Sequence, residues 1–200
     1  MHRYFILYKP FNVLSQFSPQ EGKKTLKDFF SVPSDLYPVG RLDYDSEGLL
    51  LLTNDTQLNH RLLHPQFAHE REYWVQVEGQ IDPSAIDRLQ AGVLITVNGK
   101  SYKTRPARVT LLPVPPPVPE RIPPIRYRAQ IPTSWIKMEL GEGKNRQVRK
   151  MTAGVGFPTL RLIRYRIEKI DTEGLQPGEM KEMKKALIYS LLFGAQNTNH

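Results

Sequence analysis

The sequence predicts an α+β fold in which helices flank a mixed, largely antiparallel sheet. Segments with the composition of β-strands recur along the chain, and short helical segments interrupt them at irregular intervals. The regular β–α–β alternation that builds a parallel sheet is not kept. An Asn98-Gly99 pair between two strand-like segments is typical of a tight hairpin turn. At 200 residues with 40% hydrophobic side chains, the chain is long enough for one sizeable core, or for two small subdomains that share one.

Strands are expected where aromatic and β-branched residues cluster, or where turn residues bound an apolar run. The segment from Arg3 to Tyr8 fits the first description and ends at Lys9-Pro10, because proline cannot donate to a sheet ladder. The other predicted strands cover residues 49–52, 70–79, 93–97, 101–103, 107–112, 135–140 and 160–170. The first of these is four uninterrupted leucines, which predicts a strand buried on both faces.

Helices are predicted from capping residues and from the positions of proline and glycine. The helix over residues 56–63 begins after Asp55 or Thr56 as N-cap, and the helix over residues 82–89 carries Pro83 in its first turn. Further helices are expected at residues 23–30, from residue 144 onward, and at residues 181–193, with a frayed end after Gly194. Residues 113–124 contain seven prolines, which predicts a polyproline-like connection on the surface.

Composition limits the chemistry and the partner. There is no cysteine, which excludes disulfides, thiolate metal sites and a cysteine nucleophile. No segment has the layout of a signal peptide and no apolar run reaches membrane-spanning length, so we expect a cytoplasmic location without membrane attachment. The net charge of +8 and the pI near 9.7 favour a polyanionic partner. Seven basic residues and no acid lie between residues 144 and 166, and they predict a patch for a phosphate backbone: Lys144, Arg146, Arg149, Lys150, Arg161, Arg164 and Arg166.

An acidic loop stands directly before the run of leucines. Asp43, Asp45 and Glu47 alternate and are followed by Gly48, as in the first half of an EF-hand calcium loop. The twelfth position of such a loop must be a bidentate glutamate, but here it is Asn54, so the calcium interpretation fails. Spacing alone leaves two interpretations open, a capped acidic turn or a catalytic loop on a rigid strand.

The longer stretch from Gly40 to Asp55 favours the catalytic loop. Its sixteen residues, Gly-Arg-Leu-Asp-Tyr-Asp-Ser-Glu-Gly-Leu-Leu-Leu-Leu-Thr-Asn-Asp, resemble the signature of the RsuA family of ribosomal pseudouridine synthases. This family comprises the synthases designated A, for the small ribosomal particle, and B, E and F, for the large one. The resemblance implies that Asp43 is the essential catalytic residue and that Arg41 contacts RNA. It also implies a pseudouridine synthase catalytic fold with a central cleft.

Two further motifs agree with this resemblance. The turn Tyr8-Lys9-Pro10 resembles the first motif of the family near the active site, although Asn12 stands where the family often has glycine. The alternative for Lys9 is an exposed charge at the end of a strand. The segment Arg71-Glu-Tyr-Trp-Val resembles an element whose tyrosine stacks on the target base, and Tyr73 is a candidate to manage the proton at C5. From propensity alone, Tyr73 is a half-buried strand aromatic.

The last motif joins a glycine-rich turn to a basic helix start. The segment Gly141-Glu-Gly followed by Lys-Asn-Arg-Gln-Val-Arg-Lys-Met resembles the family pattern in which Arg149 pairs with the catalytic aspartate and Val148 packs near the base. Many members have histidine at the place of Arg146. A helix start with cations is a suitable seat for phosphate, and the predicted substrate-binding residues are Lys9, Arg41, Lys144, Arg146, Gln147, Val148 and Lys150. Residues 123–126, 131–135 and 145–149 are most similar to the family members designated E.

The role of Arg149 can be tested through pH. An opposite charge within roughly 4–6 Å favours the ionised form of a carboxylate. If Arg149 keeps Asp43 ionised, Arg149→Ala raises the pH at which activity rises. The measurement is the pH profile of the reaction rate, and an unchanged profile would count against this role.

Taken together, the resemblance implies site-specific isomerisation of uridine in 23S rRNA, the RNA of the large ribosomal subunit. The enzyme flips the uridine out of its helix, and Asp43 attacks ribose C1′ or uracil C6. No metal or cofactor is expected, and His60 and His64, four residues apart, are interpreted as a solvated helix face. We expect one catalytic domain over residues 1–200 without an S4 domain, and two subdomains of it that meet at the active-site cleft. We also expect a monomer that acts on rRNA or on an assembling large subunit.

Two alternatives come from other functional classes. The first is a non-catalytic rRNA-binding assembly protein on the same fold, which would use the basic residues but not Asp43. The second is a hydrolase with two carboxylates, Asp43 and Asp45, but nothing else in the sequence supplies it with a metal or an acid partner.

Overall fold

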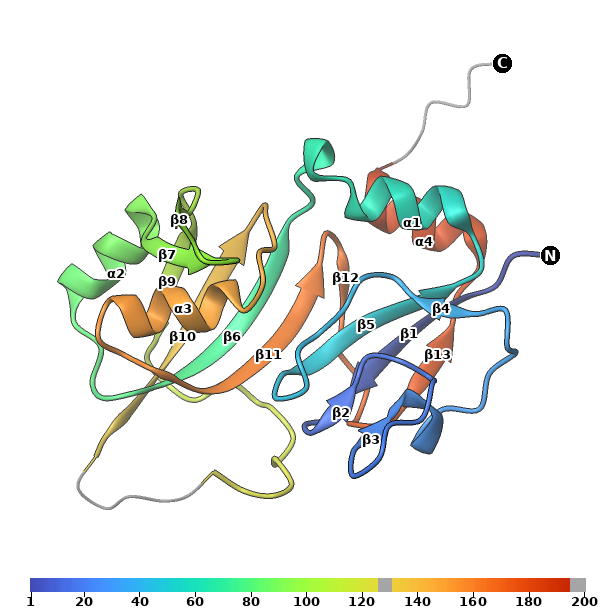
Figure 1. The fold of residues 1–200 in the computed structure, drawn as a ribbon, viewed down its shortest axis with the longest axis horizontal. Coiled ribbons are helices and arrows are strands. Elements are labelled where there is room, and N and C mark those ends of the chain that lie inside the picture. The colour runs from blue at the N-terminus through green and yellow to red at the C-terminus, as the bar shows by residue number, and fades with distance from the viewer. Residues whose placement is uncertain (126–130, 195–200) are drawn as a thin grey trace. The chain divides into compact units, whose positions relative to one another are not determined.

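The computed structural model describes residues 1–125 and 131–194, and these divide into two compact units (Figure 1). The first unit consists of Met1–His69 together with Arg164–His200, and the second unit of Glu70–Ile163. Strand β11 (Thr159–Ile167) contains the residue at which the chain passes from the second unit back into the first. Each unit has its own core, and the strands and helices of each unit are described separately below.

The sheet of the first unit is centred on two antiparallel strands. Strand β1 (Tyr4–Lys9) pairs with β5 (Glu47–Thr53) on one side and with β13 (Met180–Glu182) on the other. The register places Lys9 opposite Gly48. Three peripheral pairings complete this part of the chain: β4 (Tyr37–Pro38) on β5, β12 (Ile170–Asp171) on β11, and the short parallel pair β2 (Val13–Leu14) with β3 (Lys24–Thr25).

The leucines of β5 confirm the prediction of a strand buried on both faces. Successive side chains of a strand point to opposite faces of the sheet. Accordingly, Leu49 and Leu51 enter one apolar cluster, and Leu50 and Leu52 enter another; all four are 0% exposed. Burial of a leucine contributes about 1.5–3 kcal/mol relative to exposure, so this strand is a major source of the first unit's stability.

Two helices cover the cluster that contains Leu49 and Leu51. Helix α1 (Thr56–Leu63) has the predicted bounds, and the Asp55 carboxylate caps it by accepting from the backbone N–H groups of the second and third residues of the helix. Helix α4 (Lys185–Phe193) packs through Ile188 and Leu192. No helix within the described residues has the length and apolar content needed to cross a membrane.

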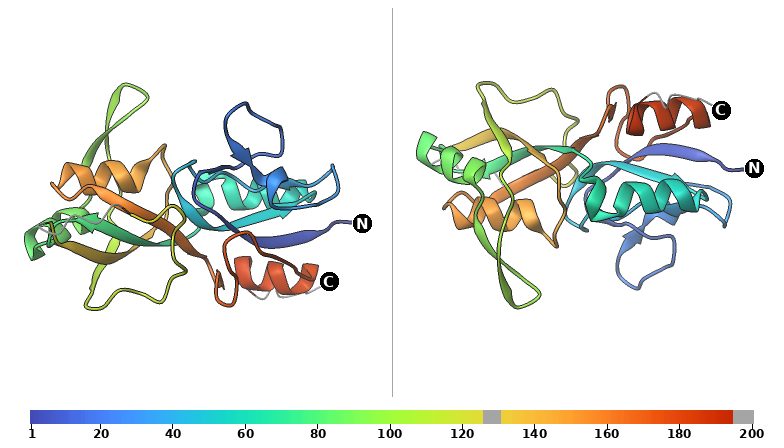
Figure 2. Two further views of the ribbon diagram at one scale, coloured as in Figure 1. Left: turned by 90° about the horizontal axis from the view of Figure 1, so that it is seen from below. Right: turned by 90° about the horizontal axis from the view of Figure 1, so that it is seen from above.

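The second unit contains antiparallel strands, two helices and a hairpin. Strand β10 (Thr133–Leu140) lies between β6 (Arg71–Glu78) and β9 (Arg108–Leu112). The hairpin predicted at Asn98-Gly99 is confirmed, and its turn projects from the unit (Figure 2). Its strands and the two helices are β7 (Leu94–Val97), β8 (Lys100–Lys103), α2 (Pro83–Ala91) and α3 (Gln147–Gly154).

Three predicted elements were wrong in extent. Residues 23–30 form strand β3 and the 3₁₀ turn η1 (Leu26–Asp28) instead of a helix, and the Asp28 carboxylate accepts from the Thr25 N–H at 2.7 Å. The predicted strand over residues 160–170 is interrupted at Glu168, whose φ of 51° makes a turn between β11 and β12. Residues 180–182 pair with β1, so the last helix starts at Lys185. The fraying predicted for the C-terminus lies outside the described residues from 195 onward, and part of the 123–126 motif also lies outside.

Candidate active site

Backbone contacts on both sides fix the position of Asp43. On one side, the Ser15 hydroxyl donates to the Leu42 carbonyl at 2.8 Å and accepts from the Leu42 N–H at 3.0 Å. On the other side, the Ser46 N–H donates to the Asp43 carbonyl at 3.1 Å and closes a turn. Leu42 is buried, whereas Asp43 is half-buried. The first unit therefore holds Asp43 in the turn just before β5, where the residue stays partly accessible to solvent.

Gly48 allows β5 to approach β11 immediately after this turn. Its φ is +105°, a backbone conformation that L-residues with a side chain rarely adopt. A Cβ at this position would lie 2.3 Å from the Arg164 carbonyl oxygen and 2.9 Å from the Arg164 nitrogen. The Arg164 guanidinium in turn donates through Nε to the Leu49 carbonyl at 2.8 Å. The glycine in the motif is therefore a packing requirement of the strand that follows Asp43.

Lys9 lies behind the acidic loop and is 0% exposed, so its interpretation as an exposed strand-end charge was wrong. Its ammonium group donates to the Pro10 carbonyl at 2.9 Å and to the Val13 carbonyl at 2.7 Å. Burial lowers the pKa of Lys9 to about 7, although the nearby carboxylates of Glu47, Asp45 and Asp43 act in the opposite direction. The amine thus ties together the turn after β1 and lies within electrostatic range of Asp43.

The lowered pKa of Lys9 predicts how stability depends on pH. The unfolded chain keeps this ammonium charged until about pH 10.5, while the folded chain loses the proton near pH 7. Between these values the unfolded state binds more protons, so stability rises with pH. We expect the free energy of unfolding to increase by on the order of 1–2 kcal/mol between pH 7 and pH 9, at most about 1.4 kcal/mol per pH unit. Urea unfolding at several pH values measures the free energy of unfolding, and Lys9→Met removes the part of its pH dependence that comes from Lys9. If the free energy of unfolding rises equally with pH in the wild type and in Lys9→Met, Lys9 is not the cause.

Two features of the turn after β1 explain how it is built. Asn12 has φ of 56°, and asparagine tolerates this left-handed conformation better than most residues other than glycine. Asn12 therefore fits the turn in which the family often has glycine. Ser15 holds the Asp43 loop, and the sequence analysis missed it, because a lone serine after a strand carries no signal of a partner 27 residues away.

In the second unit, Tyr73 and Val148 belong to one apolar cluster. Tyr73 lies on β6 opposite Met138 of β10 and is 9% exposed, and Val148 lies in the first turn of α3 and is 5% exposed. The expectations that Tyr73 stacks on the target base and that Val148 packs near it stay predictions.

Glu142 organises the turn that leads into α3. Its carboxylate accepts from the Tyr102 hydroxyl at 2.6 Å, the Arg105 N–H at 2.9 Å and the Gln147 amide at 2.7 Å. Burial by itself would raise the pKa of Glu142, but these hydrogen bonds hold it below its ordinary value. The Gln147 side chain also accepts from the Lys144 N–H at 2.8 Å, so within this unit Gln147 shapes the loop.

The basic residues between 144 and 166 do not form one surface patch. Arg161 and Arg164 are buried, 6% and 5% exposed, and their guanidinium groups donate to the Pro119 and Leu49 carbonyls. A buried guanidinium needs such acceptors, and carbonyls of neighbouring segments supply them. Four residues that are not buried are near α3: Lys144 and Arg146 are exposed, and Arg149 and Lys150 are half-buried. Arg166, on β11, is also half-buried.

The predicted site residues divide between the units. Lys9, Arg41 and Asp43 belong to the first unit, where Arg41 is exposed. Seven belong to the second unit: Tyr73, Lys144, Arg146, Gln147, Val148, Arg149 and Lys150. In the parts of the chain that the structure describes, no group of three or more histidine, aspartate or glutamate side chains is arranged to hold a metal ion. His60 and His64 are exposed, with ring centroids 5.2 Å apart.

Comparisons with known proteins agree with the motifs. Ribosomal large subunit pseudouridine synthase E of Vibrio parahaemolyticus is 46% identical over 179 residues, covering 90% of this chain and 73% of that protein. The protein of the same name from Xanthomonas campestris is 47% identical over 178 residues, covering 88% of this chain and 92% of that protein. Ribosomal large subunit pseudouridine synthase B of Bacillus subtilis is 35% identical over 181 residues, covering 90% of this chain and 67% of that protein.

The fold agrees as well. A solved structure described as pseudouridylate synthase superimposes with a TM-score of 0.78 at 26% identity, covering 96% of this chain and 74% of that chain. This confirms the predicted α+β fold class. A family model described as RNA pseudouridylate synthase matches residues 3–154. The chain therefore belongs to the RNA pseudouridylate synthase family.

Proposed function

We propose that this protein isomerises uridine to pseudouridine at a specific site in large-subunit (23S) rRNA, with Asp43 as the nucleophile. The observation that carries the proposal is the Asp43 loop. A half-buried carboxylate is held between two backbone anchors within a sixteen-residue match to the family signature. Relatives that are 46–48% identical are named as large-subunit pseudouridine synthases, which supports rRNA as the substrate.

The proposed reaction conserves atoms and electrons. The bond between ribose C1′ and uracil N1 breaks, and a bond between C1′ and C5 forms. C5 loses its proton and N1 ends with one, so the product is an isomer of the substrate. Such a reaction needs neither an oxidant nor a group donor, and a nucleophile with a proton carrier is sufficient. Asp43 attacks either C1′ or C6, which separates one difficult step into two easier ones.

The remaining residues receive roles that follow from their chemistry. Tyr73 and Val148 contact the flipped base, and the Tyr73 hydroxyl is the candidate for the C5 proton. Arg149 pairs with the carboxylate of the nucleophile, as the family pattern implies. Arg41, Lys144, Arg146 and Lys150 bind RNA phosphates. Lys9 and Gln147 already use their polar side-chain atoms in hydrogen bonds within the protein. We therefore assign to Lys9 the positioning of the Asp43 loop, and to Gln147 the positioning of the loop that leads into the basic start of α3.

The test uses the purified chain and a large-subunit rRNA transcript labelled with tritium at uridine C5. We expect tritium release to stop at about one equivalent per RNA, and chemical mapping to place the product at one uridine. The same assay on an assembling large subunit distinguishes the two forms of substrate. Binding of rRNA without tritium release from either substrate would favour the non-catalytic assembly protein. The proposal also includes a monomeric protein in the cytoplasm, with no membrane partner.

A further inference from the structure

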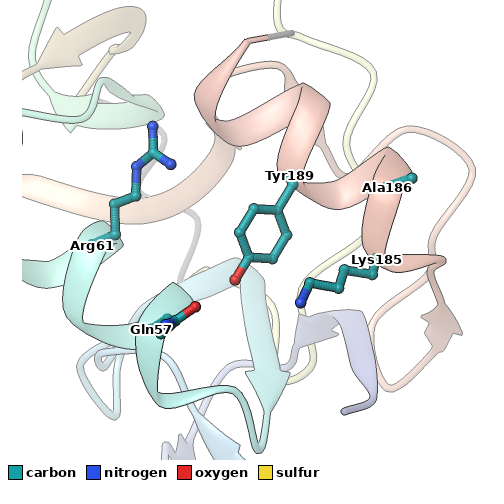
Figure 3. Close-up of a pocket in the computed structure, with 5 residues that line it drawn as sticks. All are labelled: Gln57, Arg61, Lys185, Ala186 and Tyr189. Carbon is teal, nitrogen blue, oxygen red and sulfur yellow. The ribbon is translucent and has the colours of Figure 1, made fainter. Parts of the chain in front are cut away.

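A hollow between helices α1 and α4 of the first unit is lined by none of the residues assigned to the reaction (Figure 3). Its volume is about 660 Å³, and it is lined by Gln57, Arg61, Lys185, Ala186 and Tyr189. Figure 3 shows Tyr189 reaching from α4 between the side chains of Arg61 and Lys185. Two cations from different helices therefore flank one aromatic residue.

Aromatic rings hold both cations in place. The Arg61 guanidinium carbon lies 3.9 Å from the centroid of the Phe193 ring, and the Lys185 ammonium lies 5.3 Å from the centroid of the Tyr189 ring. Such contacts orient a cation without neutralising it. Among residues 1–125 and 131–194, neither Arg61 nor Lys185 makes an ion pair with a carboxylate. Their charge is thus available to a ligand.

The carboxylate nearest to the lining residues is already satisfied. Asp55 accepts from the hydroxyls of Tyr4 and Tyr189, each at 2.7 Å, and from the backbone N–H groups of Gln57 and Leu58. Four donors stabilise its charge within the fold. Asp55 is 2% exposed, so it does not present an anion to the hollow. The Tyr189 hydroxyl donates to Asp55 in the same network, and Tyr189 lines the hollow.

We propose that this hollow binds phosphate groups of the RNA backbone outside the target uridine, with Arg61 and Lys185 as the phosphate ligands. The inference rests on the proposed function, which supplies RNA as the partner. A charged groove with an aromatic residue is the arrangement that follows a nucleic-acid strand independently of its sequence. The Gln57 amide lies at the same hollow and adds a neutral donor. The site adds affinity and positions the substrate; it does not take part in the chemistry.

The test compares two doubly substituted proteins of equal charge. Arg61→Gln with Lys185→Gln removes both ligands, and Lys169→Gln with Lys181→Gln removes two exposed cations of the same unit that do not line the hollow. We expect the first protein to bind the rRNA substrate about tenfold more weakly at roughly 100 mM salt. The slope of log K against log salt should fall by about 2 in magnitude. In the second protein, both the affinity for rRNA and the salt slope should change less than in the first.

Further measurements separate the possible failures. We expect KM to rise and kcat to stay within about twofold, because the interaction is outside the reacting atoms. Lys185→Gln alone, at an exposed position that leaves Arg61 on Phe193, should lower the slope by about 1 even if the double variant is unstable. Equal behaviour of the two double variants, with an active wild type, would overturn the phosphate site and leave the proposed function standing.

Absence of rRNA binding and conversion by the wild type would instead overturn the proposed function, and with it this inference. A free phosphate ligand is the remaining outcome. If inorganic phosphate at millimolar concentration stabilises the wild type but not the Arg61→Gln, Lys185→Gln protein, and RNA binding is unchanged, the hollow belongs to free phosphate and the RNA assignment is wrong.

Discussion

Asp43→Asn is expected to lower kcat by at least about 10³-fold, because an amide of nearly the same shape cannot act as the nucleophile. The Ser15 and Ser46 contacts are made with backbone atoms of Leu42 and Asp43, which the substitution does not change. Affinity for rRNA should remain close to that of the wild type. Tritium release from C5-labelled RNA measures the first quantity, and filter binding measures the second.

Asp45→Asn is the matched control for this prediction. Asp45 lies in the same loop, is half-buried like Asp43, and loses the same charge on substitution. We expect it to retain activity within about tenfold, because the proposed reaction uses the carboxylate of Asp43 and not that of Asp45. A similar collapse of kcat in both variants would assign the effect to loss of negative charge or to loop structure. Retained activity in Asp43→Asn would remove Asp43 from the chemistry.

Gly48→Ala is expected to destabilise the protein by about 2–5 kcal/mol, among the larger effects of single substitutions. Two costs combine. The left-handed backbone conformation costs an L-residue about 1–2 kcal/mol. The new methyl group also meets the Arg164 carbonyl oxygen at 2.3 Å, so β5 or β11 must shift at a cost of about 1–3 kcal/mol. Urea or thermal unfolding measures the loss.

Gly174→Ala separates these two costs. Gly174 also has a positive φ, +76°, but nothing lies within 4 Å of the position that its Cβ would take. We expect it to show only the conformational cost of about 1–2 kcal/mol. If Gly48→Ala costs no more than Gly174→Ala, the close approach of β5 to Arg164 does not constrain this site.

Local signals in the sequence predicted much of the first unit. Leu49 to Leu52 required burial on both faces, and Asp55 required a helix after it; both follow from the physics of a few neighbouring residues. The short motifs around Asp43, Tyr73 and Val148 identified the family, which the comparisons confirm.

The errors arose where distant segments decide the outcome. Residues 180–182 became a strand because β1 offered an edge, although their composition also suits a helix. Arg161 and Arg164 were predicted at the surface, but carbonyls of Pro119 and Leu49 satisfy them in the interior. Ser15 and Glu142 hold the two loops through contacts over 27 and 37–40 residues, respectively, and such contacts leave no local pattern in a single sequence.

If Asp43 is the nucleophile that forms one pseudouridine in large-subunit rRNA, chemical mapping of pseudouridine in cellular rRNA will show it. The rRNA comes from cells that lack this protein and from such cells complemented with the wild type or with Asp43→Asn. We expect one missing site that the wild type restores and Asp43→Asn does not. Restoration by Asp43→Asn, or a map with no missing site, would contradict it.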